Sequence, residues 1–262
     1  GTLLRWFDRW LKGMPNGVDT EAPVRLFVMG ANTWRDEPDW PLPTTQWTKY
    51  YFHSGGKANS LSGDGVLSPA QPKNEPPDRY DYDPADATPF IMPPSSSQVG
   101  GPDDYRPVGE RKDVLVYTTP PFDEDMEITG PLSVKLFAAS SAPDTDWNAM
   151  LMDVYPDGYA LRLNDGVVRA SFRESFENPS PIEPGKVTEY TIDCWTTSML
   201  IRKGHRLRVH IASAAFPKFD RNLNTGHPFG LDSEMQAARQ TVFHDAKHPS
   251  HIVLPVVPAK AK

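Results

Sequence analysis

Short apolar runs in this chain alternate with polar residues at a period of two. Residues 206–211 read Arg-Leu-Arg-Val-His-Ile, and residues 132–136 read Leu-Ser-Val-Lys-Leu. Such alternation is typical of a strand with one buried face. Similar apolar segments predict further strands at 24–29, 46–53, 147–155, 159–163, 167–172, 241–244 and 251–257.

Turn residues separate these segments at regular spacing. The triplet Pro156-Asp157-Gly158 predicts a hairpin, and Asn164-Asp165-Gly166 predicts another turn. The 28 prolines and 18 glycines fall between the apolar runs, and helix signals almost vanish after residue 22. Many short strands with little helix predict an all-β sandwich, most simply a jelly roll.

The first segment follows a helical period instead. Its apolar residues recur at i, i+3, i+4 and i+7, and Gly13 with Pro15 ends the pattern. The stripe consists of Leu3, Leu4, Trp6, Phe7, Trp10 and Leu11. A helix of this length is marginal alone. We therefore expect Trp6, Phe7 and Trp10 to pack on this chain's sandwich or on a preceding domain, because the helix starts without a cap.

Composition excludes several partner classes. The net charge of −7 and pI of about 5.5 argue against nucleic acid and against an anionic membrane. No apolar run approaches the roughly 18 to 20 residues that span a bilayer. The lone Cys194 favours a reducing cytoplasm, although it leaves secretion open.

Catalytic motifs are absent from the sequence. No Gly-x-Ser-x-Gly occurs, so no serine is marked as the nucleophile of an esterase elbow. A Ser-His-Asp triad is defined by geometry rather than spacing, and nothing in the sequence selects one serine for it. We assign no catalytic residue to this chain.

Metal-ligating residues form no strong pattern. His244, His248 and His251 would share a face of a helix, but Pro249 and the apolar run after it predict a turn entering a strand. The acidic residues Asp123, Glu124, Asp125, Asp144, Asp146, Asp157 and Asp165 fall in predicted turns and make no EF-hand. We expect neither a metal nor a cofactor.

One loop is dense in hydrogen-bonding side chains. Asp220, Arg221 and Asn222 precede Asn224-Thr225-Gly226. These residues predict either a ligand clamp, with Arg221 as a planar donor, or a polar network that fixes a long loop. We favour a structural lock formed by Asp220, Arg221 and Asn222.

Tryptophans in and around a proline-rich stretch suggest an interface. Trp34, Trp40 and Trp47 could stack on sugars, whereas in such a stretch they more often fill a domain interface. We therefore place Trp34 and Trp40 at an interface, together with the aromatic residues of the first helix.

Several stretches together resemble one family, the cocaine esterase-like serine hydrolases, which are similar to the X-prolyl dipeptidyl peptidases and α-amino acid ester hydrolases. The resemblance covers nearly all of residues 1–258 and concerns the C-terminal region of that family. It is carried by 82–86 (YDPAD), 113–119 (DVLVYTT), 127–131 (EITGP), 140–147 (SSAPDTDW), 153–158 (DVYPDG), 204–206 (GHR), 216–226 (FPKFDRNLNTG) and 248–251 (HPSH).

The resemblance implies an α/β-hydrolase domain with Ser, Asp and His, a helical cap, and a C-terminal jelly roll of galactose-binding-like type. Residues 1–22 would be the last helix and linker of the hydrolase domain, and residues 23–262 the jelly roll. The triad would then lie upstream, so none of the seven histidines is the general base, and the chain alone is expected to be inactive.

The resemblance also implies a place for the substrate, a small ester or amide bound through the hydrolase domain. The proline-rich segment 82–107 would run beside the acyl pocket, with Phe90, Ile91 and Met92 as its wall. The main alternative function is a carbohydrate-binding module, and an oligomerisation domain is a second. A homo-oligomer stays open, as does the identity of the substrate.

Overall fold

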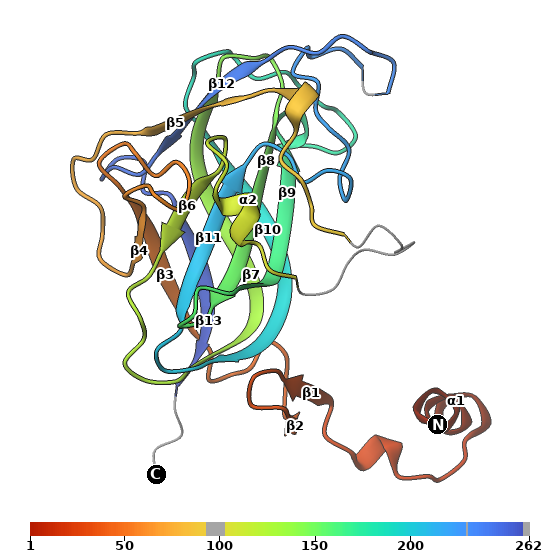
Figure 1. Cartoon of the computed structure of the whole chain (residues 1–262). Coiled ribbons are helices and arrows are strands. Elements are labelled where there is room, and N and C mark those ends of the chain that lie inside the picture. Colours follow the sequence, from red (N-terminus) through yellow and green to blue (C-terminus); the bar gives the residue numbers. More distant parts are fainter. Residues whose placement is uncertain (93–102, 229, 259–262) are drawn as a thin grey trace.

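The computed structural model describes residues 1–92, 103–228 and 230–258 (Figure 1). The helical segments in these residues are α1 (Thr2–Lys12), η1 (Val18–Thr20), η2 (Pro84–Asp86), α2 (Arg106–Gly109) and η3 (Ala170–Phe172). The strands are β1 (Val24–Val28), β2 (Thr33–Glu37), β3 (Gln46–His53), β4 (Val66–Ser68), β5 (Asp78–Tyr82), β6 (Leu115–Thr118), β7 (Met126–Ser140), β8 (Asp146–Val154), β9 (Ala160–Arg169), β10 (Thr188–Ile201), β11 (Arg206–Ala212), β12 (Ala238–Phe243) and β13 (His251–Val257).

The long strand β7 organises the sandwich. One edge of β7 pairs antiparallel with β10, and the other edge pairs first with β13 and then with β12. Strands β6, β11, β8 and β9 form the second layer, which the short β4 joins to β3. The predicted all-β sandwich is confirmed.

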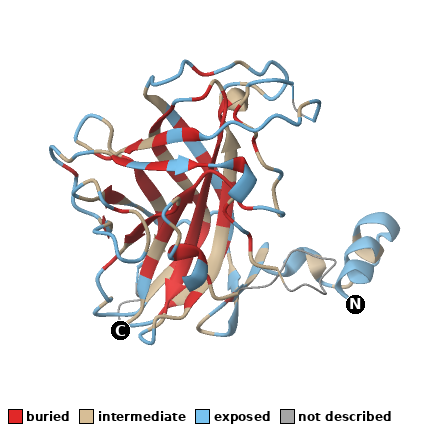
Figure 2. Ribbon diagram, turned by 45° about the horizontal axis from the view of Figure 1, so that its top comes forward, coloured by how far each residue is buried: buried red, intermediate tan, exposed pale blue. Residues whose placement is uncertain are grey.

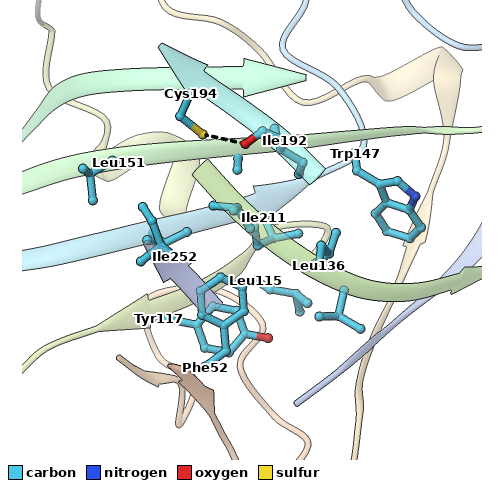
Figure 3. Close-up of a cluster of buried hydrophobic side chains, with 14 of the residues drawn as sticks. Phe52, Leu115, Tyr117, Leu136, Trp147, Leu151, Ile192, Cys194, Ile211 and Ile252 are labelled. Atoms are coloured by element: carbon cyan, nitrogen blue, oxygen red, sulfur yellow. Dashed lines mark hydrogen bonds between the residues drawn. The ribbon is translucent and has the colours of Figure 1, made fainter. Parts of the chain in front are cut away.

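The main core lies between the two layers, and Figure 3 shows part of it. Alternate residues of β11, Leu207, Val209 and Ile211, point into it, as the period of two predicts. Trp147 on β8 and Ile192 on β10 are also fully buried there. Each such side chain contributes roughly 1.5 to 3 kcal/mol of burial energy.

A second, smaller cluster covers the outer face of β6, β11 and β8. Met150, Met152 and Val154 belong to it, whereas their neighbours on β8 face the main core. The segment around Phe90, together with Tyr105 and α2, lies over this face. Strand β8 is therefore buried on both sides, and six of its nine residues are apolar.

Two details of the strand prediction were wrong. Residues 164–166 are not a turn, because β9 runs through them with an irregular register opposite Leu151 and Met152. Gly166 is needed there for close packing, since a Cβ at that position would collide with the backbone of Asp193. Strands β2, β4, β5, β6 and β10 were missed, although the inward residues of β10 alternate clearly.

Helix α1 forms as predicted but does not pack on the sandwich. It ends at Gly13 in the left-handed conformation, and none of its residues is buried (Figure 2). Ion pairs of Arg5 with Glu21 and of Arg9 with Asp19 hold it to the following segment instead. In this structure the chain's own sandwich does not cover the stripe.

Candidate functional site

A buried polar cluster joins three strands at one edge of the sandwich. Ser54 follows β3, Asp78 begins β5, and His244 follows β12. The Ser54 Oγ atom donates to both Asp78 carboxylate oxygens at 2.8 Å and lies 3.2 Å from His244 Nε2. His244 Nε2 is 2.9 Å from Asp78 Oδ2, and its Nδ1 is 3.3 Å from Glu75 Oε2.

This cluster has the residue types of a serine hydrolase triad, so its protonation decides its chemistry. Both His244 nitrogens face carboxylates, and Asp78 and His244 are fully buried. Burial lowers the pKa of His244, but the hydrogen bond and charge of Asp78, with the charge of Glu75, raise it above its usual value overall. The two carboxylates therefore favour the protonated imidazole.

A cationic His244 cannot accept the proton of Ser54. A general base must be unprotonated on the nitrogen that faces the nucleophile, whereas in the protonated ring that nitrogen donates to Asp78, 2.9 Å away. Tyr117 and the backbone of Ala58 also donate to Asp78. Burial raises the pKa of Asp78, but these bonds and the one from His244 lower it below its usual value overall. These contacts favour an ion pair between Asp78 and protonated His244.

The ion pair predicts a dependence of stability on pH. The raised pKa of His244 gives a contribution that is present below about pH 6.5 and is lost as the pH rises through the folded-state pKa. The lowered pKa of Asp78 gives a contribution that is present above about pH 3.8 and is lost on acidification. Urea unfolding of the isolated chain should therefore show falling stability above pH 6.5.

The variant His244→Gln is the control for this pH dependence, since glutamine can donate to Asp78 but cannot titrate. We expect its stability to change less than that of the parent between pH 6.5 and 9. An equal decline in both proteins would mean that other groups cause the alkaline loss.

The predicted polar lock is centred on Asn222 rather than on Arg221. The buried Asn222 amide donates to Asp144 at 3.0 Å and to Asp146 at 2.9 Å, and its oxygen accepts from the backbone of Asn224. The half-buried Arg221 donates to the carbonyl of Pro84 at 2.9 Å. Removing the Asn222 amide would leave two buried carboxylates short of a donor. We expect this to cost more stability than removing Arg221, which would leave one carbonyl short of a donor.

The same loop lines a cavity of about 510 Å³ at one end of the sandwich. The guanidinium of Arg221 lies 5.0 Å from the ring centre of Phe216 in this cavity, and Asp220 accepts from Arg169 at its rim. Asp220, Arg221 and Asn222 all line this cavity, and Asn222 also fixes the loop, so the lock stays a prediction.

The three residues expected to line the acyl pocket differ in position. Phe90 is buried in the second cluster, with Arg162 and Lys218 4.8 Å and 5.2 Å from its ring centre. Ile91 and Met92 are partly buried against the same cluster. Residues 93–102 of the predicted wall segment lie outside the described residues. Because Phe90 is buried, only Ile91 and Met92 of the three residues have accessible surface that could face a pocket.

The five aromatic residues assigned to an interface are all accessible. Their exposed fractions run from 38% for Trp40 to 64% for Trp34, and those of Trp6, Phe7 and Trp10 lie between. Trp34 lies on β2, which pairs only with β1 among the described strands. Figure 1 shows α1, which carries Trp6, Phe7 and Trp10, and the β1–β2 hairpin, which carries Trp34, at the same end of the molecule.

The residues considered as metal ligands are taken up by other partners. His248 faces Asp245, and His251 Nδ1 faces the carbonyl of Pro249. Asp144 and Asp146 hold Asn222, as described above. His227, Asp232 and Glu234 bring ligand atoms within 4.8 Å of one another, the only such group in the described residues. Asp232 already accepts from Thr225 and from the backbone of Glu234.

Comparison with known proteins identifies the class of this β-sandwich. Residues 16–253 match the family described as the X-Pro dipeptidyl-peptidase C-terminal non-catalytic domain. The chain belongs to this family. The structural assignment of the Ser54 cluster agrees with a domain of this family, because its description is non-catalytic.

The similar proteins are hydrolases of esters and peptides. The cocaine esterase of Rhodococcus sp. (strain MB1 Bresler) is 44% identical over 256 residues, which cover 96% of this chain and 45% of that protein. An aminopeptidase from a Thaumarchaeota archaeon is similar in structure, with a TM-score of 0.84, 30% identity, and coverage of 98% of this chain and 43% of the other. An α-amino acid ester hydrolase is also similar in structure, with a TM-score of 0.83 and 29% identity. The match covers 97% of this chain and 44% of that protein.

The chain therefore spans less than half the length of each of these relatives. The expected membership in the C-terminal region of cocaine esterase-like hydrolases is confirmed, whereas the carbohydrate-binding alternative finds no support among the comparisons. In the described residues, no helix is long and apolar enough to cross a bilayer.

Proposed function

We propose that this chain is the non-catalytic part of a serine hydrolase that cleaves small esters or amides. The observation that carries the proposal is the match of residues 16–253 to a non-catalytic domain family, with 44% identity to a cocaine esterase over nearly the whole chain. In the whole protein, acyl transfer to a serine and hydrolysis of the acyl-enzyme would take place on an α/β-hydrolase domain outside these 262 residues.

The role of this chain would be to cover that domain. The apolar stripe of α1 and the aromatic residues Trp34 and Trp40 supply the surface, since they are exposed here and need a partner in water. Residues 1–22 would belong to the hydrolase domain, which agrees with the separation of α1 from the sandwich. Ile91 and Met92 would reach the acyl pocket from the sandwich side.

This role predicts a change of substrate preference in the whole protein. Replacing Ile91 and Met92 by alanine should shift kcat/KM among p-nitrophenyl esters of short and long acyl chains, because the wall of the pocket loses apolar volume. An X-Pro p-nitroanilide, assayed in parallel, distinguishes peptidase from esterase activity.

Phe90→Ala is the control for the Ile91 and Met92 variants, because it removes a buried side chain of the second cluster. We expect it to lower the stability of the protein and to leave the preference among acyl chain lengths nearly unchanged. If the Ile91 and Met92 variants keep the parent's preference over the whole ester series, these residues do not line the pocket.

A further inference from the structure

Two arginines on the outer face of the sandwich form no close ion pair with any described residue. Arg206 and Arg208 project from the same side of β11, two residues apart. Arg208 is half-buried, and its Nε donates to Thr118 Oγ1 at 3.0 Å. Arg206 is exposed at the rim and donates to the carbonyl of Thr119 at 3.3 Å. Among the described residues, neither guanidinium forms an ion pair.

Other half-buried arginines in this chain meet carboxylates. Arg111 binds Asp113 at 2.7 Å, and Arg169 binds Asp146 at 2.8 Å. Removing a guanidinium from water is costly unless an anion compensates it. The pair on β11 instead places two like charges together. Burial and the neighbouring charge of Arg206 lower the pKa of Arg208 to about 10, although the charge of Asp104 acts in the opposite direction.

A cavity of about 570 Å³ lies over these two guanidinium groups. Its walls come from three separate segments: the loop before β4, the end of β6 with the residues after it, and the turn between β8 and β9. The apolar part of the lining includes Val66, Pro120, Pro121, Val154, Tyr155 and Pro156. The lining also includes Asp64, whose carboxylate accepts from the backbone of Gly55 at 2.9 Å. The site therefore combines two arginines with partly apolar walls and one carboxylate that already has a donor.

We propose that Arg206 and Arg208 form a binding site for an organic carboxylate. A guanidinium presents paired N–H donors that match the two oxygens of a carboxylate. The apolar walls would contact a short hydrocarbon body, so the site should prefer an alkyl carboxylate to a bare inorganic anion. The proposal is independent of the hydrolase function, because it uses only this face of the sandwich.

Isothermal titration of the isolated chain with hexanoate tests the site, in buffer free of other carboxylates and of phosphate. Three compounds serve as controls. Hexanamide has the same alkyl chain without the charge, acetate has the carboxylate with a shorter alkyl chain, and inorganic phosphate has negative charge but no alkyl chain. We expect hexanoate to bind more tightly than each of the three. At about five times its Kd, it should raise the melting temperature by roughly 2–4 °C at constant ionic strength.

Variants locate the site. Arg208→Met and Arg206→Gln should each weaken hexanoate binding at least tenfold, and Arg208→Met should melt no lower than the parent without ligand, since it relieves a buried charge. The control Arg239→Gln removes an exposed arginine from β12, paired with Asp81, and should bind like the parent.

Hexanoate binding is also measured with the whole protein. If the isolated chain binds hexanoate and the whole protein does not, an acidic side chain from the rest of the protein fills the site, and the carboxylate assignment stands. The proposal is overturned if hexanoate binds the isolated chain no better than hexanamide, or if both arginine variants bind it like the parent.

Discussion

Replacing Asp78 by alanine is expected to lower the free energy of unfolding by about 3–5 kcal/mol. The carboxylate accepts from Ser54, Tyr117, His244 and the backbone of Ala58, and all of its surface is buried. Without it, a buried imidazolium and three other donors lose their acceptor. Urea or guanidinium unfolding of the isolated chain, compared with the parent at one pH between 4 and 6.5, measures the effect.

Asp81 is the matched control, because it lies on the same strand and differs in burial. Its carboxylate is exposed and pairs with the exposed Arg239 at 3.1 Å. An exposed ion pair contributes about 0–1 kcal/mol, so Asp81→Ala should be close to neutral. Equal losses in the two variants would show that the buried cluster does not carry the stability that we assign to it.

Replacing Trp6, Phe7 and Trp10 by serine should destabilise the whole protein while leaving the isolated chain nearly unchanged. The three side chains are about half exposed here and pack on nothing in the sandwich. If they are covered by the hydrolase domain, each contributes about 1.5–3 kcal/mol to that contact. Thermal inactivation of esterase activity, set beside melting of residues 1–262 alone, separates the two cases.

Comparing the triple variant in the whole protein and in the isolated chain tests what the stripe of α1 packs against. A loss of stability in the whole protein alone places the stripe against the hydrolase domain. If the triple variant instead lowers the melting temperature of the isolated chain by the same amount, α1 packs on the sandwich in solution, and the interface assignment fails.

The strand pattern was predictable for part of the sheet, whereas β5 and β10 were missed although one face of each is buried. Residues 46–53 and 251–257 form strands at the predicted bounds, and β11 shows the predicted alternation. The prediction failed at residues 164–166, where local turn propensity competes with packing. Asp165 is buried there because Lys218 and Arg162 bind its carboxylate, and neither partner could be identified from local sequence.

The Ser54–Asp78–His244 cluster could not have been predicted from spacing. Ser54 and His244 are 190 positions apart, and only the pairing of β12 with β5 brings His244 beside Asp78. His244 did stand out in the sequence, but as a metal candidate grouped with His248 and His251. The family resemblance, by contrast, rests on ordered local motifs, so it was visible without the fold.

The most direct test of the account is labelling with a fluorophosphonate probe, which reacts with activated serines. The isolated chain and the whole natural protein are treated in parallel, and labelled peptides are identified by mass spectrometry. The account predicts no label on residues 1–262 and one labelled serine elsewhere in the whole protein. Stoichiometric labelling of Ser54 in the isolated chain, abolished in Ser54→Ala, would contradict it and make the buried cluster a catalytic triad.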